Sequence, residues 1–228
     1  MGKLFVIHAR QAPIAVIVRR GPSKWRHVLS WNTQTDHIEY GAWVKGQIHP
    51  EKCDLSFDGK LFVYFLHKEG YTKDNLPNSW TALSRPPWLT ALALWPQGDT
   101  YYGGGRFTRN RQLALRPLTK GLGDKCHPDF PNTYVKIDQN DNPDVHYSAD
   151  LIPGADWSGY DVKGNVIYTI GDKLLRMTTG GASEVADFSD LTPDPQPSPD
   201  WARTFSDKAA PRTILAVPGS VPSRRSPR

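Results

Sequence analysis

The alternation of apolar and polar positions predicts short β-strands along most of the chain. Residues 14–18 are apolar and mostly β-branched, and every second residue from 25 to 31 is Trp, His or Leu, so one face of a strand is apolar. A third strand is expected at residues 37–44, after a polar turn at 32–36. Consecutive strands joined by such short turns are typical of an antiparallel meander.

The strongest local prediction is a hairpin over residues 53–67. Asp58-Gly59 is a preferred two-residue turn between strands, because Gly adopts positive φ freely and Asp tolerates it. From Leu61 to Leu66, apolar or aromatic residues occupy both faces of the second strand. Such a strand must be covered on both sides by other parts of the fold.

Strand patterns continue through the chain, and helical periodicity is almost absent. Only residues 182–191 have the pattern of a short helix. Further strands are expected at residues 89–95, 112–116, 134–138, 145–148, 166–170 and 174–177. The sequence therefore predicts an all-β fold of antiparallel four-stranded meanders and argues against a doubly wound α/β fold.

The composition changes near residue 192. Before it, short apolar segments alternate with turns, and the 20 Pro, 19 Gly and eight Trp of the chain suit a fold of many short strands. From Thr192 the sequence T-P-D-P-Q-P-S-P-D-W favours extended polyproline II conformation. We therefore expect one domain over residues 1–191 and a Pro/Arg-rich, mostly disordered tail over 192–228, in which residues 213–217 are apolar enough to return as an edge strand.

Two stretches resemble the blades of WD-repeat and TolB-like β-propellers. The first joins W-N-T-Q-T, from Trp31, to D-L-S-F-D-G-K-L-F-V-Y, and the second is A-D-W-S-G-Y-D-V-K-G-N-V-I-Y-T-I-G-D-K-L-L-R-M, residues 155–177. In those families a blade begins with a strand that ends in a Ser-Pro-Asp-Gly-Lys turn, whereas here Phe57 replaces the Pro and Asn32 replaces the Asp of Trp-Asp. The resemblance implies blades of about 40 residues, each a four-stranded antiparallel sheet.

At that blade length, the chain before residue 192 makes about four or five blades at most. Three arrangements remain open. The fold is a small irregular ring, a partial propeller completed by a partner or a second chain, or a β-sandwich.

Aromatic residues are concentrated around a Pro-rich loop. Tyr71, Trp80, Trp88 and Trp95 surround Pro86-Pro87. Loops on one face of a propeller form its usual docking surface, and exposed Trp and Tyr residues carry much of the binding energy at protein interfaces. The alternative is that these rings fill the core between blades.

Two basic clusters are candidates for contact with nucleic acid, and the formal net charge of the chain is +5. Aromatic rings beside cationic groups bind single strands by stacking and charge, but Arg and Lys near hairpin turns are also ordinary solvated surface. Gly103 to Gly105 have two alternative interpretations: their backbone amides form a cradle for a phosphate, or they mark an irregularity in a strand. The clusters are Arg19, Arg20, Lys24 and Arg26, and Arg106, Arg109 and Arg111 with Tyr101 and Tyr102.

No complete catalytic or metal-binding motif is present. Cys126 and His127 are adjacent, so they point to opposite sides of an extended segment. The aspartates at 138, 141 and 144 lack the Gly and Glu that complete a calcium loop. Cys53 and Cys126 are expected to be reduced thiols. The sequence thus predicts no catalytic residue, no metal site and no cofactor.

These observations favour a non-catalytic, cytoplasmic binding or scaffold protein whose partner is another protein. A nucleic-acid-binding module and an enzyme with an unidentified site remain as alternatives. The N-terminal apolar run is broken at His8, so no signal peptide is expected. No window of 18 uninterrupted apolar residues occurs, so we expect no membrane span.

Overall fold

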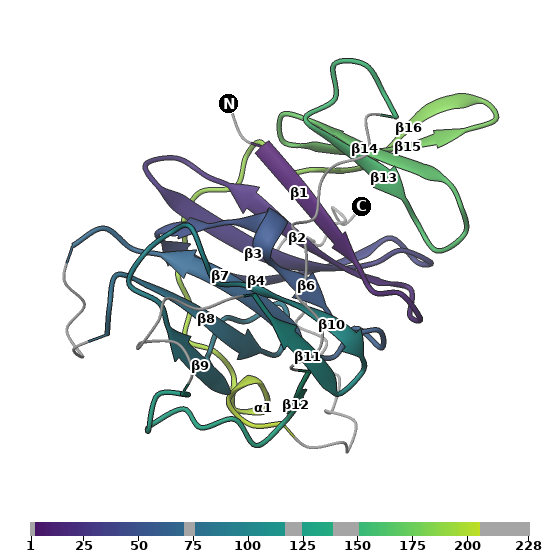
Figure 1. The fold of residues 1–228 in the computed structure, drawn as a ribbon. Helices are drawn as coiled ribbons and strands as arrows, with labels where there is room; N and C mark the ends of the chain where they lie inside the picture. The colour runs from purple at the N-terminus through teal and green to yellow at the C-terminus, as the bar shows by residue number, and fades with distance from the viewer. Residues whose placement is uncertain (1–2, 71–75, 117–124, 139–150, 206–228) are drawn as a thin grey trace, which may run out of the picture.

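The computed structural model describes residues 3–70, 76–116, 125–138 and 151–205, and nearly all regular structure in them is β (Figure 1). The strands form four sheets, A to D, in chain order. The predicted all-β class with antiparallel four-stranded meanders is therefore confirmed. Tyr71, residues 145–148 and residues 213–217 lie outside the described residues.

Sheet A is a four-stranded antiparallel meander, and it contains the three strands expected near the N-terminus. A first strand precedes them and pairs residue by residue with the second, from Lys3 opposite Arg20 to His8 opposite Ala15. The pairing of the third and fourth strands shifts between His27 and Leu29. The strands of sheet A are β1 (Lys3–His8), β2 (Ile14–Arg20), β3 (Trp25–Asn32) and β4 (His37–Lys45).

Sheet B contains the predicted hairpin, and its turn differs from the expected one. Four residues separate Ser56 from Leu61, and only Gly59 among them has positive φ, at 75°. The Ser56 hydroxyl accepts hydrogen bonds from the N–H groups of Lys60 and Leu61, so this side chain shapes the wider turn. The elements of sheet B are β5 (Gln47–Ile48), the 3₁₀ turn η1 (Pro50–Lys52), β6 (Asp54–Leu55), β7 (Phe62–His67), β8 (Ser79–Ser84) and β9 (Ala93–Pro96).

Sheets C and D complete the fold, and sheet D corrects one prediction. The segment expected to be helical, residues 182–191, instead supplies the edge strand β16 (Gly181–Asp187). Its pairing with β15 satisfies the backbone groups that a helix would have satisfied internally. Sheet C has β10 (Gly105–Arg109), β11 (Gln112–Leu115) and β12 (Lys136–Ile137), and sheet D has β13 (Trp157–Tyr160), β14 (Val166–Ile170), β15 (Lys173–Thr178) and β16.

The turn between β13 and β14 is built like the turn between β6 and β7. The N–H of Gly164 donates to the Asp161 carbonyl at 3.0 Å, as that of Gly59 does to the Ser56 carbonyl at 2.8 Å. The Asp161 carboxylate accepts from the N–H groups of residues 163 and 165, the role of the Ser56 hydroxyl in the other turn. The two stretches that resemble propeller blades thus contain related turns, which differ in length because Ser56 closes on Leu61 and Asp161 closes on Asn165.

The sheets pack face to face in the order D, A, B, C. One apolar cluster joins sheets D and A around Trp31 and Trp157, and a second joins sheets A and B around Val16 and Phe62. A third cluster joins sheets B and C around Val63. In Figure 1, β13 and β14 accordingly lie beside β1. The prediction that the strand at residues 61–66 is covered on both faces is confirmed.

Arginine–aspartate pairs connect the sheets at their edges. Arg10, in the turn after β1, contacts the buried Asp54 of sheet B at 3.1 Å, and Asp54 also accepts the N–H of Phe107 in sheet C at 2.7 Å. Between sheets A and D, Arg19 pairs with Asp172 at 2.6 Å. Asp54 therefore binds groups from both sheets that flank its own.

The Pro-rich segment does not leave the body at residue 192. Residues 192–205, here called the strap, run from sheet D to sheets B and C and end in the short helix α1 (Asp200–Arg203) (Figure 1). Ala202 is fully buried, and the Thr90 hydroxyl donates to the Ser198 hydroxyl at 2.6 Å. The packed chain therefore extends past the boundary that composition suggested.

None of the helices in the described residues is long and apolar enough to span a membrane. The α-helix α1 has four residues.

Candidate docking groove

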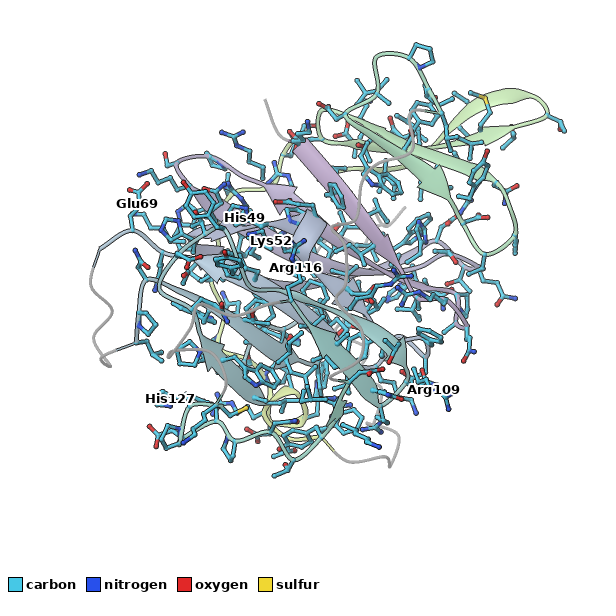
Figure 2. All side chains as sticks on the ribbon, viewed as in Figure 1. His49, Lys52, Glu69, Arg109, Arg116 and His127 are labelled. Carbon is cyan, nitrogen blue, oxygen red and sulfur yellow. The ribbon has the colours of Figure 1, made fainter. Side chains whose placement is uncertain are left out.

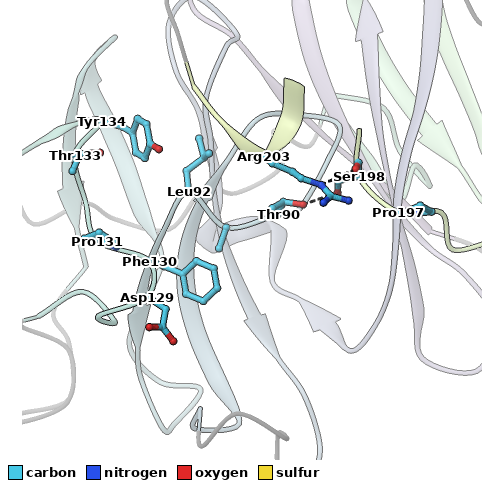
Figure 3. Close-up of a pocket in the computed structure, with 11 residues that line it drawn as sticks. Thr90, Leu92, Asp129, Phe130, Pro131, Thr133, Tyr134, Pro197, Ser198 and Arg203 are labelled. Carbon is cyan, nitrogen blue, oxygen red and sulfur yellow. Dashed lines mark hydrogen bonds between the residues drawn. The ribbon is translucent and has the colours of Figure 1, made fainter. Parts of the chain in front are cut away.

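Two adjoining hollows lie between the end of sheet B, the loop that precedes β12 and the strap. The larger, of about 460 Å³, has Leu92 and Phe130 on its floor and Ser198 and Arg203 on its strap side (Figure 3). Its full lining is Thr90, Ala91, Leu92, Asp129, Phe130, Pro131, Thr133, Tyr134, Pro197, Ser198 and Arg203.

The smaller hollow, of about 310 Å³, is more aromatic. It shares Ala91, Asp129 and Phe130 with the larger one, so the two form a continuous depression, here called the groove. Its other lining residues are Tyr64, Leu76, Trp80, Leu89, Leu94 and His127.

Hydrogen bonds to sheet B fix the walls of the groove. The Tyr64 hydroxyl, on β7, donates to the Leu89 carbonyl at 2.7 Å and holds the loop between β8 and β9. Burial raises the pKa of this phenol well above its usual range, so it remains a neutral donor. On the other wall, the backbone N–H of Leu94 donates a hydrogen bond to the Phe130 carbonyl at 3.1 Å. The groove is therefore supported by regular structure on both sides.

The apolar residues 89–92 line this groove instead of continuing a strand. The sequence predicts a strand over residues 89–95, but β9 begins only at Ala93. Leu92 donates its N–H to the Leu83 carbonyl at the end of β8, and the three residues before it bend away as loop. Their apolar side chains contribute to a surface hollow.

The groove contains few groups suited to catalysis. The N–H of Asp129 donates to His127 Nδ1 at 3.3 Å, and the Asp129 side chain is 81% exposed. Cys126 packs with the apolar cluster between sheets B and C, on the other side of its segment, and burial raises its thiol pKa. In the described part of the chain, no three His, Cys, Asp or Glu side chains are grouped so that they would hold a metal ion. The lining is suited to holding an apolar group.

Of the predicted aromatic residues, the structure brings Trp80 to the groove. Trp95 is 3% exposed and packs in the core between sheets B and C, which matches the core alternative. Trp88 is half-buried and does not line either hollow, and its indole N–H is buried without a hydrogen-bond partner. The aromatic group therefore divides between surface and core.

Tyr101 and Tyr102 are exposed on a loop that a buried lysine holds. Lys52 Nζ donates to the carbonyls of Thr100, Tyr101 and Tyr102, and the two tyrosines are 84% and 48% exposed. Burial, and then the nearby Arg116, lower the pKa of Lys52. Both rings are therefore accessible, and neither lines the groove.

The glycines that follow allow a close backbone approach. A Cβ on Gly104 would lie 2.3 Å from the Lys52 carbonyl oxygen, and the Gly104 N–H already donates to the Thr81 hydroxyl at 2.7 Å. This arrangement fits the strand-irregularity alternative better than a phosphate cradle.

The two predicted basic clusters lie at opposite ends of the sheets. Arg20 and Arg26 face each other in the strand register at the end of β2 and β3, and Lys24 binds Glu69 there. Arg109 lies at the other end of the sheets, in the turn where Asn110 accepts the N–H of Asp58 (Figure 2). Two cations of the first cluster are paired with carboxylates, since Arg19 is 3% exposed and contacts Asp172 and Lys24 contacts Glu69.

In the second cluster Arg106 and Arg109 are exposed, and the Arg111 guanidinium lies 4.1 Å from the centre of the Phe205 ring. The structure therefore does not bring the two clusters together.

Sequence reasoning missed Phe130, Tyr134 and the strap residues of the groove. Phe130-Pro131 stands in a polar loop, and the strap was expected to be disordered because of its prolines. The two aromatic residues that end the strap, Trp201 and Phe205, were the available signal, since aromatic anchors four positions apart suit docking.

No family model matches the chain, and neither the curated proteins nor the solved structures compared with it give a match. Inference about function therefore rests on the geometry of this molecule.

Proposed function

We propose that this chain is a non-catalytic, propeller-like binding protein that docks a peptide segment of a protein partner in the groove. The observation that carries the proposal is the pair of adjoining hollows with a shared floor of Ala91 and Phe130. Pockets lined mainly by apolar and aromatic side chains with a few polar groups are typical binding sites. Trp80 and Tyr134, both half-buried, are suitable anchors for a partner side chain.

The propeller interpretation is supported by the order of strands and sheets. Sheets A and D are four-stranded meanders in chain order, and sheet D packs on sheet A, as the last blade packs on the first in a closed ring. Sheet C is the irregular member, because β12 pairs with β11 in parallel. We propose an irregular ring, open between sheets C and D or completed there by a second chain, in the cytoplasm, where its two free thiols would stay reduced.

A peptide fits the groove better than a small compact ligand. The groove is elongated, because its two hollows share only part of their lining, and it is open toward solvent at Asp129. The extended strap already runs along one wall, so the same surface accommodates a second extended chain with alternate side chains in the two hollows.

A displayed library of random dodecapeptides, selected on the purified full chain, tests this function. We expect enriched peptides with at least one large apolar residue. Ala91→Trp, which fills the shared floor, is expected to weaken their binding about tenfold or more, which corresponds to about 1.4 kcal/mol.

Ala182→Trp, on the exposed face of β16, is the matched control and is expected to leave binding unchanged. Enrichment of no peptide, or of peptides that bind both variants equally, would overturn the proposed function. Thermal unfolding of each variant establishes that it is folded.

A further inference from the structure

The end of the strap is held by a guanidinium that contacts two rings and two carbonyls. Arg85, just after β8, lies 4.9 Å from the centre of the Trp201 ring and 5.5 Å from that of Phe205. Its Nη1 donates to the carbonyls of Trp201 and Thr204. Such a contact depends on the positions of both aromatic rings and of the backbone between them. The partial burial of the Arg85 guanidinium lowers its pKa.

Other parts of the body complete this contact. The guanidinium of Arg111, in the turn after β10, also lies over the Phe205 ring at 4.1 Å, and Tyr134 meets the same ring edge-on at 6.1 Å. Thr90 binds Ser198 through the two hydroxyls. Arg85, Thr90, Arg111 and Tyr134 are here called the clamp. They come from three separate segments, so the clamp exists as a surface of the body without the strap.

The strap itself contributes little to its own attachment. Its helix has four residues, and no side chain caps its N-terminus. Of residues 192–200, all are exposed or half-exposed. Ala202 is the one fully buried residue of the strap, and a segment with so few buried residues opens locally at lower free energy than a sheet in the core.

We propose that the clamp is a peptide-recognition site for a segment with two aromatic residues four positions apart, and that residues 198–205 are its resident, exchangeable occupant. The same segment of a second copy of this chain is the partner that fits it, because every contact would be reproduced. A tethered segment acts at an effective concentration in the millimolar range, so the resident strap excludes free segments of equal affinity.

Exchange of the resident strap for another segment would change the groove, and this consequence rests on the proposed function. Pro197, Ser198 and Arg203 form the strap side of the larger hollow. When the strap leaves the clamp, that wall is lost and the floor at Leu92 is uncovered. The clamp is therefore placed to couple strap release to opening of the groove.

A fluorescein-labelled peptide of residues 192–205, titrated with the full-length chain and followed by anisotropy, tests the clamp. The wild type is expected to bind it weakly. The full-length variant Trp201→Ala/Phe205→Ala, which has lost its own anchors, is expected to bind it at least tenfold more tightly. Adding Arg85→Ala to that variant is expected to remove the gain, and a peptide with Trp201→Ala and Phe205→Ala is expected not to bind.

Equal binding to the wild type and the anchor variant, or a gain that survives Arg85→Ala, would overturn the proposal. Should the variants unfold, hydrogen exchange of the wild type decides. Amides of residues 201–205 are expected to exchange at least a hundredfold faster than those of β7, and exchange together with β7 would overturn it. The dodecapeptide selection reports on the groove and the labelled strap peptide reports on the clamp, and Arg85 lines neither hollow, so failure of the groove and failure of the clamp are distinguishable.

Discussion

Sheets B and D contain equally apolar strands, but their surroundings differ. In β7, Phe62 to Leu66 are all buried, because sheet A covers one face and sheet C the other. In sheet D, Tyr160 and Ile170 are 56% and 46% exposed on the face turned away from sheet A. Apolar residues on both faces of a strand therefore predict two covering layers only when the sheet lies inside the stack.

Sheet C, at the other end of the stack, has a polar outer face. Its face toward sheet B contributes Phe107 and Leu113 to the core. The alternate positions of β10, Arg106 and Thr108, are polar and at least half-exposed. The two terminal sheets therefore differ in the polarity of their outer faces: that of sheet D exposes apolar side chains, and that of sheet C exposes polar ones.

The largest expected effect comes from removing the carboxylate that sheet B shares with both neighbours. Asp54→Ala leaves the Arg10 charge without its partner and the buried N–H of Phe107 without an acceptor. We expect a loss of about 3 kcal/mol in the free energy of unfolding, measured by urea denaturation. Asp194→Ala, on the exposed strap, is the control and is expected to cost less than about 0.5 kcal/mol. A loss below about 1 kcal/mol for Asp54→Ala would contradict this role.

Acid is expected to weaken the contact between sheets A and D. His8 lies between Trp31 and Trp157 with both ring nitrogens unpartnered, and burial, partly offset by Asp161, lowers its pKa to about 4. Between pH 6.5 and about 4 the unfolded chain therefore binds a proton that the folded chain does not, so stability is full above pH 6.5 and falls as the pH decreases.

The loss from His8 is expected to approach about 2–3 kcal/mol at pH 4. Urea denaturation at pH 7 and pH 4.5 measures it. In His8→Phe the pH dependence should be smaller by that amount over the same interval, while His27, whose pKa is also lowered to about 4, contributes equally in both proteins. An unchanged pH dependence in His8→Phe would show that the imidazole is not desolvated.

A smaller effect is expected on the open face of sheet D. Ile170→Ala should reduce the free energy of unfolding by less than about 1 kcal/mol, because much of the side chain is already in water. Leu66→Ala, in the covered strand β7, is the contrast and should cost about 3 kcal/mol. Equal losses in urea denaturation would mean that the outer face of sheet D is covered in solution.

The smallest effect is expected on the polar face and turn of sheet C. Replacing Arg106, Arg109 and Arg111 by Glu should move elution from a single-stranded DNA column to lower salt by no more than a matched charge reversal at the other end does, because both changes lower the net charge equally and the two clusters lie at opposite ends of the sheets. The triple variant Arg20→Glu/Lys24→Glu/Arg26→Glu is the matched control for that end. Earlier elution of the first variant alone would favour the nucleic-acid-binding alternative.

The sequence predicted strands best where apolar residues follow a regular pattern. The hairpin at residues 53–67 and the strands of sheet A after β1 were found on that basis. Strand β8 was missed because Ser79, Thr81 and Ser84 are polar yet buried. Ser79 donates to the Asp99 carbonyl and Thr81 accepts the Gly104 N–H, so distant backbone groups satisfy these two side chains, while the Ser84 hydroxyl is buried without a hydrogen-bond partner in the described part of the chain. A strand whose polar side chains bond to remote loops has no local signature.

The groove was less predictable than the fold. Trp80 was a candidate because aromatic residues were concentrated around it. The rest of the lining comes from Tyr64, Phe130 and Ser198, which are far apart in the chain and meet only through sheet stacking and the strap. The prolines of the strap excluded a packed core of its own, but they did not exclude packing on the clamp.

The position of sheet D beside sheet A has a consequence for how the chain is made. The Thr169 hydroxyl donates to the Leu4 carbonyl across 165 positions of sequence. Synthesis proceeds at about 5–20 residues per second, so roughly ten seconds or longer pass between synthesis of sheet A and synthesis of sheet D, which covers the face with Ile17 and Trp31. Contacts of such long range also slow folding. Of the four described sheets, the one synthesised earliest is therefore covered last on this face, and until then the apolar face is open to chaperones and to aggregation.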